Sequence, residues 1–226
     1  MPAQRDPGAL PSLKDVHWLG HDGFLIVEEA TGKRIYVDPY RLKRHEPADL
    51  ILITHDHHDH FSPDDVAKLR KPETVIVTVP SVASQLSDGH VITVHPGDRV
   101  VAAGIPIEAV PAYNVSKFRS PGVPFHPKSA GFVGFIVTVN GERIYHAGDT
   151  DLIPEMDGLQ VDVALLPVSG TYVMTADEAA EAAARIKPKV AVPMHYGAIV
   201  GSEADAQRFA QLCAARGIPV EVLRPS

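Results

Sequence analysis

The chain has 226 residues, 45% of them hydrophobic and 22% charged, which is typical of one globular domain over residues 1–226. Lysine and arginine total 21 against 28 aspartates and glutamates, a formal net charge of −7, and this acidic balance disfavours nucleic acid as a partner because its phosphates are repelled. Cys213 is the only cysteine, which excludes an internal disulfide and a thiolate metal site.

The first part of the chain gives no sign of targeting or of membrane insertion. Residues 1–12 are polar and proline-rich, without the apolar core of a signal peptide. No stretch of the sequence approaches the ~18 uninterrupted apolar residues that a spanning helix needs. We therefore expect a cytoplasmic protein that does not enter a membrane.

Short runs rich in valine and isoleucine, separated by glycine, proline, aspartate and asparagine, predict strands along most of the chain. In chain order the predicted strands are Val16–Leu19, Gly23–Glu28, Arg34–Asp38, Leu50–Thr54, Val75–Val79, Val91–Val94, Ile105–Val110, Phe132–Val139, Arg143–His146, Val161–Leu166, Val190–Met194 and Val220–Leu223.

Three helices are predicted between these strands. Ser62 has the properties of an N-cap ahead of a helix at Pro63–Arg70. A capping-box pattern at Thr175 precedes an alanine-rich helix, and a third helix starts at Ser202 and stops at Gly217. Strands followed by alternating strands and helices indicate an α/β protein whose sheets are covered by helices.

Four histidines and two aspartates directly follow the predicted strand Leu50–Thr54. They are His55, Asp56, His57, His58, Asp59 and His60. Imidazole and carboxylate are the ligands that suit zinc when thiolates are absent. Because the chain turns at a strand end, His55 and His57 can face one metal while Asp59 and His60 face a neighbouring one. A solvated histidine-rich turn or a tag-like tract is the alternative, but such tracts are not embedded between a buried strand and a capped helix.

Three segments in order resemble the metallo-β-lactamase superfamily. Thr54–His60 resembles the H-x-H-x-D-H signature that follows an apolar strand, Tyr145–Asp151 the segment that supplies a metal-bridging aspartate, and Val192–Gly197 the segment with the final histidine ligand. The branch most similar is the compact one that includes ascorbate-6-phosphate lactonase and many uncharacterised metal-dependent hydrolases. The resemblance implies a four-layer αββα sandwich with its site on loops at one edge of the sheets.

The resemblance also implies metal ligands by position. His55 and His57 would serve a first metal, Asp149 would bridge, and the second metal would be served by Asp59, His60 and His195. Taken alone, Asp149 could equally be an ordinary turn aspartate and His195 a core histidine. Their order and their placement at strand ends favour the ligand role.

One position departs from the family pattern. The family's third motif usually adds a histidine to the first metal, but the matching segment here ends in Asn114, and an amide is a poor zinc ligand compared with imidazole. Either His126 reaches in from the long loop Tyr113–Ala130, or the first metal has an incomplete shell and a single metal acts. We expect Asn114, His126 and Lys128 to contact the substrate.

Other polar residues are open to two interpretations. Lys117, Arg119 and Lys128 suit an anionic substrate, or they are solubilising charges of the loop. His21 lies where this branch often has a histidine close to the site, although a surface turn is the alternative, and His146 is a candidate partner of a ligand.

The function that the resemblance and the residues predict is metal-dependent hydrolysis. One or two divalent ions, zinc first and manganese, iron or nickel as alternatives, would activate water, and Asp59 would orient this water and accept its proton. The substrate expected is a small anionic ester, lactone or phosphodiester. The alternatives are a metal-binding protein without catalysis and an oxidoreductase, although the di-iron relatives of this scaffold carry glutamate where this chain has His57. A homo-oligomer is compatible with the sequence.

Overall fold

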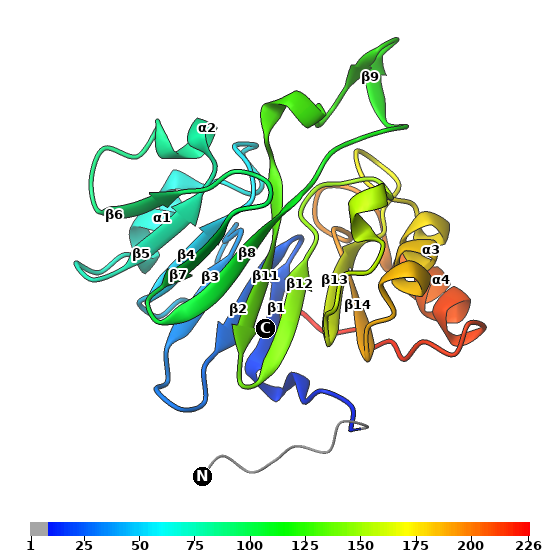
Figure 1. The fold of residues 1–226 in the computed structure, drawn as a ribbon, viewed down its shortest axis with the longest axis horizontal. Helices are drawn as coiled ribbons and strands as arrows, with labels where there is room; N and C mark the ends of the chain where they lie inside the picture. The colour runs from blue at the N-terminus through cyan, green and yellow to red at the C-terminus, as the bar shows by residue number, and fades with distance from the viewer. Residues whose placement is uncertain (1–8) are drawn as a thin grey trace.

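Two six-stranded sheets packed against each other form the centre of the molecule (Figure 1). The computed structural model describes residues 9–226, so the first eight residues of the polar N-terminal stretch lie outside the described part. The first sheet has its strands in sequence order: β1 (Val16–Gly20), β2 (Gly23–Val27), β3 (Arg34–Val37), β4 (Leu50–Ile53), β5 (Val75–Thr78) and β6 (His90–Thr93).

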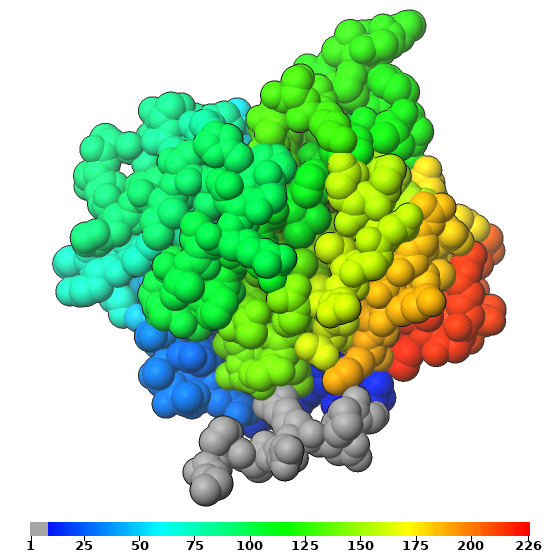
Figure 2. Space-filling view, viewed as in Figure 1, coloured from blue at the N-terminus to red at the C-terminus, as the bar shows by residue number. Residues whose placement is uncertain are grey.

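The second sheet contains the later strands in the spatial order β14-β13-β12-β11-β8-β7. Its strands are β7 (Arg99–Ala102), β8 (Ile105–Pro111), β11 (Val133–Val139), β12 (Glu142–His146), β13 (Val163–Pro167) and β14 (Val190–Met194). A separate hairpin of β9 (Phe118–Ser120) and β10 (Val123–Pro124) projects from the body of the protein (Figures 1 and 2).

Helices cover the two sheets on opposite sides of the molecule (Figure 1). Within residues 9–226 the α-helices are α1 (Pro63–Leu69), α2 (Pro80–Ala83), α3 (Ala176–Ile186) and α4 (Glu203–Ala214), and short 3-10 turns occur at Leu13–Asp15, Lys128–Ala130 and Pro154–Met156. Helices α1 and α2 lie beside β4 to β6, while α3 contacts β13 and α4 contacts β14. The alanine-rich face of α3 is buried, which allows a close approach to the sheet. The αββα architecture and the α/β class are as predicted. None of these helices is long and apolar enough to cross a membrane.

Strand β4 is buried on both faces. All four of its side chains, Leu50 to Ile53, are 0% exposed, because β4 lies inside its sheet with the second sheet on one side and helix α1 on the other. Burying one such aliphatic side chain contributes about 1.5–3 kcal/mol. The loop that follows β4 therefore starts from a rigid support.

Parallel pairing brings several strand ends to the same edge. Strands β3, β4 and β5 pair in parallel, as do β12, β13 and β14. The carboxyl ends of parallel strands meet at one edge of a sheet, where ligands of α/β proteins commonly bind. Residues 38, 55–60, 149 and 195 all follow such strand ends.

Most predicted elements are confirmed to within one or two residues, with clear exceptions. The predicted strand Val220–Leu223 is wrong: Val220 alone forms a bridge, with Ala191, because the C-terminal segment then leaves β14 and reaches Trp18, whose carbonyl accepts from Ser226 N–H. Strands β7, β9 and β10 and the single-turn helix α2 were not predicted. Strands β7, β9 and β10 are largely exposed, so their sequences lack the apolar alternation that marks a strand.

Candidate metal centre

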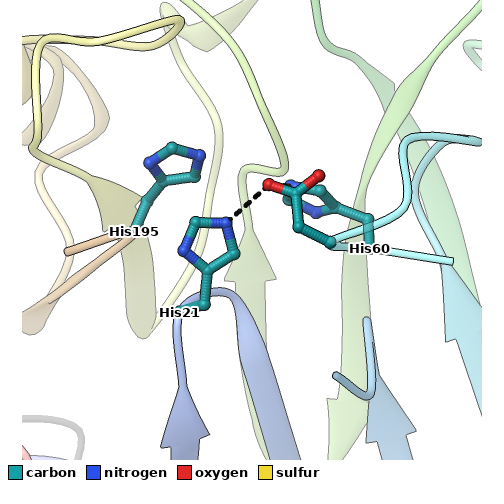
Figure 3. Close-up of side chains that lie close together, drawn as sticks. His21, His60 and His195 are labelled. Atoms are coloured by element: carbon teal, nitrogen blue, oxygen red, sulfur yellow. Dashed lines mark hydrogen bonds and ion pairs between the residues drawn. The ribbon is translucent and has the colours of Figure 1, made fainter. Parts of the chain in front are cut away.

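Polar side chains from five separate segments converge at this edge of the sheets. The segments are the turn between β1 and β2 and the loops after β4, β10, β12 and β14, which supply, in that order, His21; His55, His57, Asp59 and His60; His126; Asp149; and His195. Figure 3 shows the rings of His21, His60 and His195 close together, with ring centroids 4.2 Å apart for His21 and His195 and 5.5 Å apart for His21 and His60. All six predicted metal ligands are brought together.

Asp149 lies between two groups of imidazole nitrogens. Its Oδ1 is 3.3 Å from Nε2 of His60 and 3.3 Å from Nε2 of His195. Its Oδ2 is 3.2 Å from Nε2 of His126 and 3.8 Å from Nε2 of His55. One carboxylate therefore faces two separate donor sets, one on each oxygen.

The donor atoms fall into two sets, and within each set all donor atoms lie within 4.8 Å of one another. The first donor set is His55, His57, His126 and Asp149, and the second, which Asp149 adjoins, is His21, Asp59, His60 and His195.

The spacing of the donor atoms fits a single cation in each set. Ligands at 2.0–2.2 Å from one ion and at the corners of a tetrahedron lie about 3.3–3.6 Å apart. In the first set, Nδ1 of His57 is 3.1 Å from Nε2 of His55 and 3.2 Å from Nε2 of His126. In the second, Nε2 of His60 is 3.6 Å from Oδ2 of Asp59. These separations match the edges of such a tetrahedron to within a few tenths of an ångström.

Hydrogen bonds behind the rings fix where their protons lie. His60 Nδ1–H donates to Asp38 Oδ2 at 2.8 Å, and the Thr54 hydroxyl donates to the same oxygen at 2.6 Å. Because the Thr54 proton is used in this way, its Oγ1 accepts from His55 Nδ1–H at 2.9 Å. When these imidazoles are neutral, Nε2 of each carries a lone pair directed at Asp149, and this tautomer is the one that binds metal.

Several of these acceptor atoms are buried without a partner. Among the described residues, His60 Nε2, His195 Nε2 and Asp149 Oδ1 have no accessible surface and no hydrogen bond. Leaving such groups unpaired costs about 1–3 kcal/mol each, and more for a charged one. A cation at this point would satisfy all three, so the residues present fit a bound metal ion.

The electrostatics differ between the two donor sets. Burial lowers the pKa of His55 and, to a lesser degree, that of His57, so both imidazoles are neutral. Burial also opposes protonation of His60 and His195, but the Asp149 carboxylate outweighs it and raises the pKa of both, to about 9 for His195. The negative charge of Asp149 therefore favours positive charge at the second set, either protons on its imidazoles or a metal ion that takes their place.

Asp59 is held by His21. Their Nε2 and Oδ2 atoms are 2.9 Å apart, the dashed line in Figure 3. Burial opposes the charge of Asp59, but the bond to His21 and the proximity of His60 outweigh it and keep the pKa of Asp59 well below its ordinary value. The Asp59 side chain is 14% exposed against 4% for Asp149, so it is the more accessible carboxylate. His21 itself is 1% exposed and is not a surface-turn residue.

The three predicted substrate-contacting residues have different surroundings. His126 and Asn114 are buried, and His126 belongs to the first donor set. Lys128 lies outside both sets, with Nζ 2.8 Å from Glu155 Oε1. Lys117 is likewise paired, 2.7 Å from Glu178.

Arg119, the third basic residue of the loop, has its guanidinium carbon 5.7 Å from the centre of the Phe125 ring. His146, the other candidate partner of a ligand, donates from Nε2 to the Asp22 carbonyl and accepts at Nδ1 from Gly148 N–H. Both of its nitrogens are therefore occupied.

Two further residues support the ligands, and sequence reasoning missed the role of Asp38. Asp38 is fully buried and orients Thr54 and His60, and Ser169 contacts His195 Nδ1 at 2.9 Å. The available signal was position, because each follows the carboxyl end of a strand parallel to one that carries a ligand. Asp38, His21 and His195 also have positive φ angles of 43°, 53° and 61°, a strained conformation that concentrates at functional sites.

Comparison with protein families agrees with this geometry. The model of the beta-lactamase superfamily domain matches residues 15–195, which include both donor sets. A relative from Carboxydothermus hydrogenoformans, described as a metal-dependent hydrolase, is 32% identical over 93% of this chain and 96% of its own length.

Solved structures of metal-dependent hydrolases are also similar to this chain. A candidate metal-dependent hydrolase from Parabacteroides distasonis is 33% identical, with a TM-score of 0.81 over 92% of this chain and 93% of that one. Igni18, a metallo hydrolase from the archaeon Ignicoccus hospitalis, is 28% identical, with a TM-score of 0.75 over 93% and 95% of the two chains.

Proposed function

Because the chain belongs to the beta-lactamase superfamily and is one of its metal-dependent hydrolases, we propose that it hydrolyses a small ester, lactone or phosphodiester at a centre of two divalent ions. The ligands proposed for these ions are His55, His57, Asp59, His60, Asp149 and His195. The observation that carries the proposal is the position of Asp149, whose two oxygens face separate groups of imidazole nitrogens at 3.2–3.8 Å.

A divalent ion held by these ligands would lower the pKa of a coordinated water to about 7 and polarise the carbonyl or phosphoryl oxygen of the substrate. Zinc is the ion we propose, because imidazole and carboxylate at tetrahedral spacing are its usual ligands, with manganese, iron and nickel as alternatives.

Asp59 is the residue that we assign to proton transfer. Its carboxylate is ionised at neutral pH, held in place by His21 and open to solvent over 14% of its side chain. It can therefore accept a hydrogen bond from the attacking water and take its proton as the bond to the substrate forms. A general base that is positioned in this way contributes roughly 10²- to 10⁴-fold to a rate.

The charges around the site bear on the choice of substrate. Lys117 and Lys128 are paired with Glu178 and Glu155, so neither ammonium group needs an anion from the substrate. We therefore give a carboxylic ester or lactone precedence over a phosphodiester.

The test is a comparison of zinc-loaded and chelated protein on p-nitrophenyl acetate, a γ-lactone and bis(p-nitrophenyl) phosphate. We expect hydrolysis that is abolished by chelation and restored by zinc, and a loss of at least roughly 10²-fold in kcat for Asp59→Asn. His95→Ala, which removes an imidazole that is 67% exposed, is the matched control and should leave kcat unchanged.

Two results would contradict the proposal. Full activity of the Asp59→Asn variant would show that Asp59 is not the group that accepts the proton of the attacking water. Protein that binds two zinc ions but hydrolyses none of the three substrate classes would point to a metal-binding protein without hydrolytic catalysis.

A further inference from the structure

A cavity of about 710 Å³ lies next to the second donor set but outside it. Its walls come from the end of β1, the loop after β14, the first two turns of α4 and the C-terminal segment 222–225. Among the described residues, His21 is the one that the cavity shares with either donor set. Small-molecule sites have volumes of roughly 300–1,000 Å³, so this cavity is large enough for a ligand that does not lie on the ions.

Two buried aromatic rings form one wall of this cavity. The ring centroids of Trp18 and Tyr196 are 4.8 Å apart, and the two residues are only 4% and 5% exposed. Trp18 Nε1–H donates to the His21 carbonyl at 2.9 Å, and the Trp18 carbonyl accepts from the backbone N–H of Ser226. These bonds tie the indole to the β1–β2 turn and to the C-terminal segment, so the wall has a fixed position.

Two side chains of opposite charge line the same cavity. Glu203 comes from the first turn of α4, and Arg224 comes from the C-terminal segment. Within residues 9–226 neither side chain forms an ion pair, with the other or with any third residue. The ammonium groups of Lys117 and Lys128, in contrast, both have carboxylate partners. The cavity therefore offers one unpaired positive group and one unpaired negative group beside an apolar wall.

Polar atoms without a partner also occur at the aromatic wall. Burial and the nearby charge of Glu203 raise the pKa of Tyr196 to about 12, so its hydroxyl keeps its proton at neutral pH. His21 Nε2–H donates to Asp59, which leaves Nδ1 as an acceptor, and Nδ1 is buried without a hydrogen bond in the described part of the chain. Figure 3 shows this nitrogen on the edge of the ring turned away from Asp59. The wall can thus take both a hydrogen-bond donor and an acceptor from a ligand.

The pair of charges limits the class of ligand. An organic anion would be attracted by Arg224 but repelled by Glu203, and an organic cation would meet the reverse. A ligand that carries an ammonium and a carboxylate can pair with both side chains at once. Trp18, Val222 and Leu223 offer apolar surface for the rest of such a molecule. Free amino acids and short peptides have this chemistry.

We propose that the cavity is a second small-molecule site, which binds a zwitterion with an apolar body, namely a free amino acid or a short peptide. The ammonium of the ligand pairs with Glu203, its carboxylate pairs with Arg224, and its apolar body lies against Trp18. The site does not depend on the proposed hydrolysis, because neither the ions nor Asp149 border the cavity.

The fluorescence of Trp18 measures occupancy directly, because Trp18 is the only tryptophan of the chain. The probes are L-phenylalanine, the dipeptide phenylalanyl-leucine, phenylacetate and phenethylamine, each titrated into zinc-loaded protein. We expect a saturable change with a zwitterion, and the tighter of the two zwitterions identifies the amino acid or the peptide as the source. Phenylacetate and phenethylamine keep the ring but only one charge, so they should bind at least roughly fivefold more weakly.

Variants of the lining residues locate the bound probe. Arg224→Gln and Glu203→Gln should each weaken binding of the zwitterion roughly two- to fivefold, as expected for ion pairs that remain partly in solvent. Ala198→Phe places a ring in the cavity without a change of charge and should abolish binding. Arg44→Gln and Glu221→Gln are the matched controls, because both side chains are exposed and neither lines the cavity. The two charge variants alter exposed side chains, so the test stands even where Ala198→Phe does not fold.

Four results would overturn the proposal. They are the absence of a saturable change with both zwitterions, phenylacetate binding as tightly as L-phenylalanine, charge variants that bind as wild type does, and binding that disappears on chelation. The last result would place the probe on the ions. Hydrolysis of the ester and lactone substrates is measured separately, so hydrolysis without a fluorescence change contradicts only the cavity site. A fluorescence change without hydrolysis contradicts only the proposed function.

Discussion

Replacement of Asp38 by asparagine tests whether the metal centre depends on residues behind its ligands. The Asp38 carboxylate is 0% exposed and accepts three hydrogen bonds: Thr54 N–H at 2.8 Å, the Thr54 hydroxyl at 2.6 Å and His60 Nδ1–H at 2.8 Å. Asparagine keeps one acceptor oxygen. If that oxygen stays on Thr54 N–H, the new amide NH₂ faces two donors, and both bonds to Oδ2 are lost.

The size of the effect follows from these contacts. A hydrogen bond to a charged group contributes about 1.5–3 kcal/mol, so losing two should lower the free energy of unfolding by about 3–6 kcal/mol, less whatever rotation of the Thr54 hydroxyl recovers. With Nδ1 unsupported, His60 also loses its fixed tautomer. We expect zinc affinity at the second donor set to fall roughly 10- to 100-fold, or about 1.4–2.7 kcal/mol.

The assay is chelator competition on protein whose folded fraction has first been established by circular dichroism. Asp88→Asn, which changes a side chain that is 76% exposed, is the matched control and should bind zinc as wild type does. Folded Asp38→Asn with unaltered zinc affinity would show that His60 needs no support from Asp38, and the reasoning would be refuted.

Two further predictions concern the fold and its dependence on pH. Leu52→Ala in the fully buried strand β4 should lower the free energy of unfolding by about 2–5 kcal/mol, measured by urea titration, and a loss below about 1 kcal/mol would mean that the core closes around the cavity. Glu108→Gln tests the hydrogen bond and charge of Arg143, which lower the pKa of Glu108 below its ordinary value of 4.5. A carboxylate with a lowered pKa stabilises the folded state above its unfolded-state pKa and loses this contribution as pH falls through its folded-state pKa. The metal-free variant should therefore be about 0.5–1 kcal/mol less stable than wild type at pH 7, with the gap closing below pH 4.5; a gap that widens in acid would contradict the assignment.

The sequence predicted the part of the site that is local. His55 to His60 are consecutive and follow an apolar strand, so their convergence needs only one turn of the chain. Asp149 and His195 required the family resemblance, because nothing in a single strand end shows which other strand will lie beside it. Pairing of β12 with β13 and of β13 with β14 brings them together.

The rest of the site depends on contacts between segments that are far apart in the sequence. The periodicity of hydrophobic residues does not reveal such contacts. His21 and Asp59 are 38 positions apart and Asn114 and Tyr172 are 58 apart, and the members of each pair follow different strands of one sheet, so they meet only through the pairing of that sheet. The hairpin of β9 and β10 was missed because its five residues are too few to show an alternating pattern. An approach of His126 to the first metal was one of two alternatives at the sequence level, and the fold brings its ring beside His55, His57 and Asp149, while its role as a ligand stays a prediction.

The most direct test of the account is anomalous diffraction at the zinc edge from crystals of the zinc-loaded protein. The account predicts two peaks, one beside each carboxylate oxygen of Asp149, with His55 and His57 among the ligands of the first and Asp59 among those of the second. No peak next to Asp149, or zinc bound only at the exposed histidines, would contradict it.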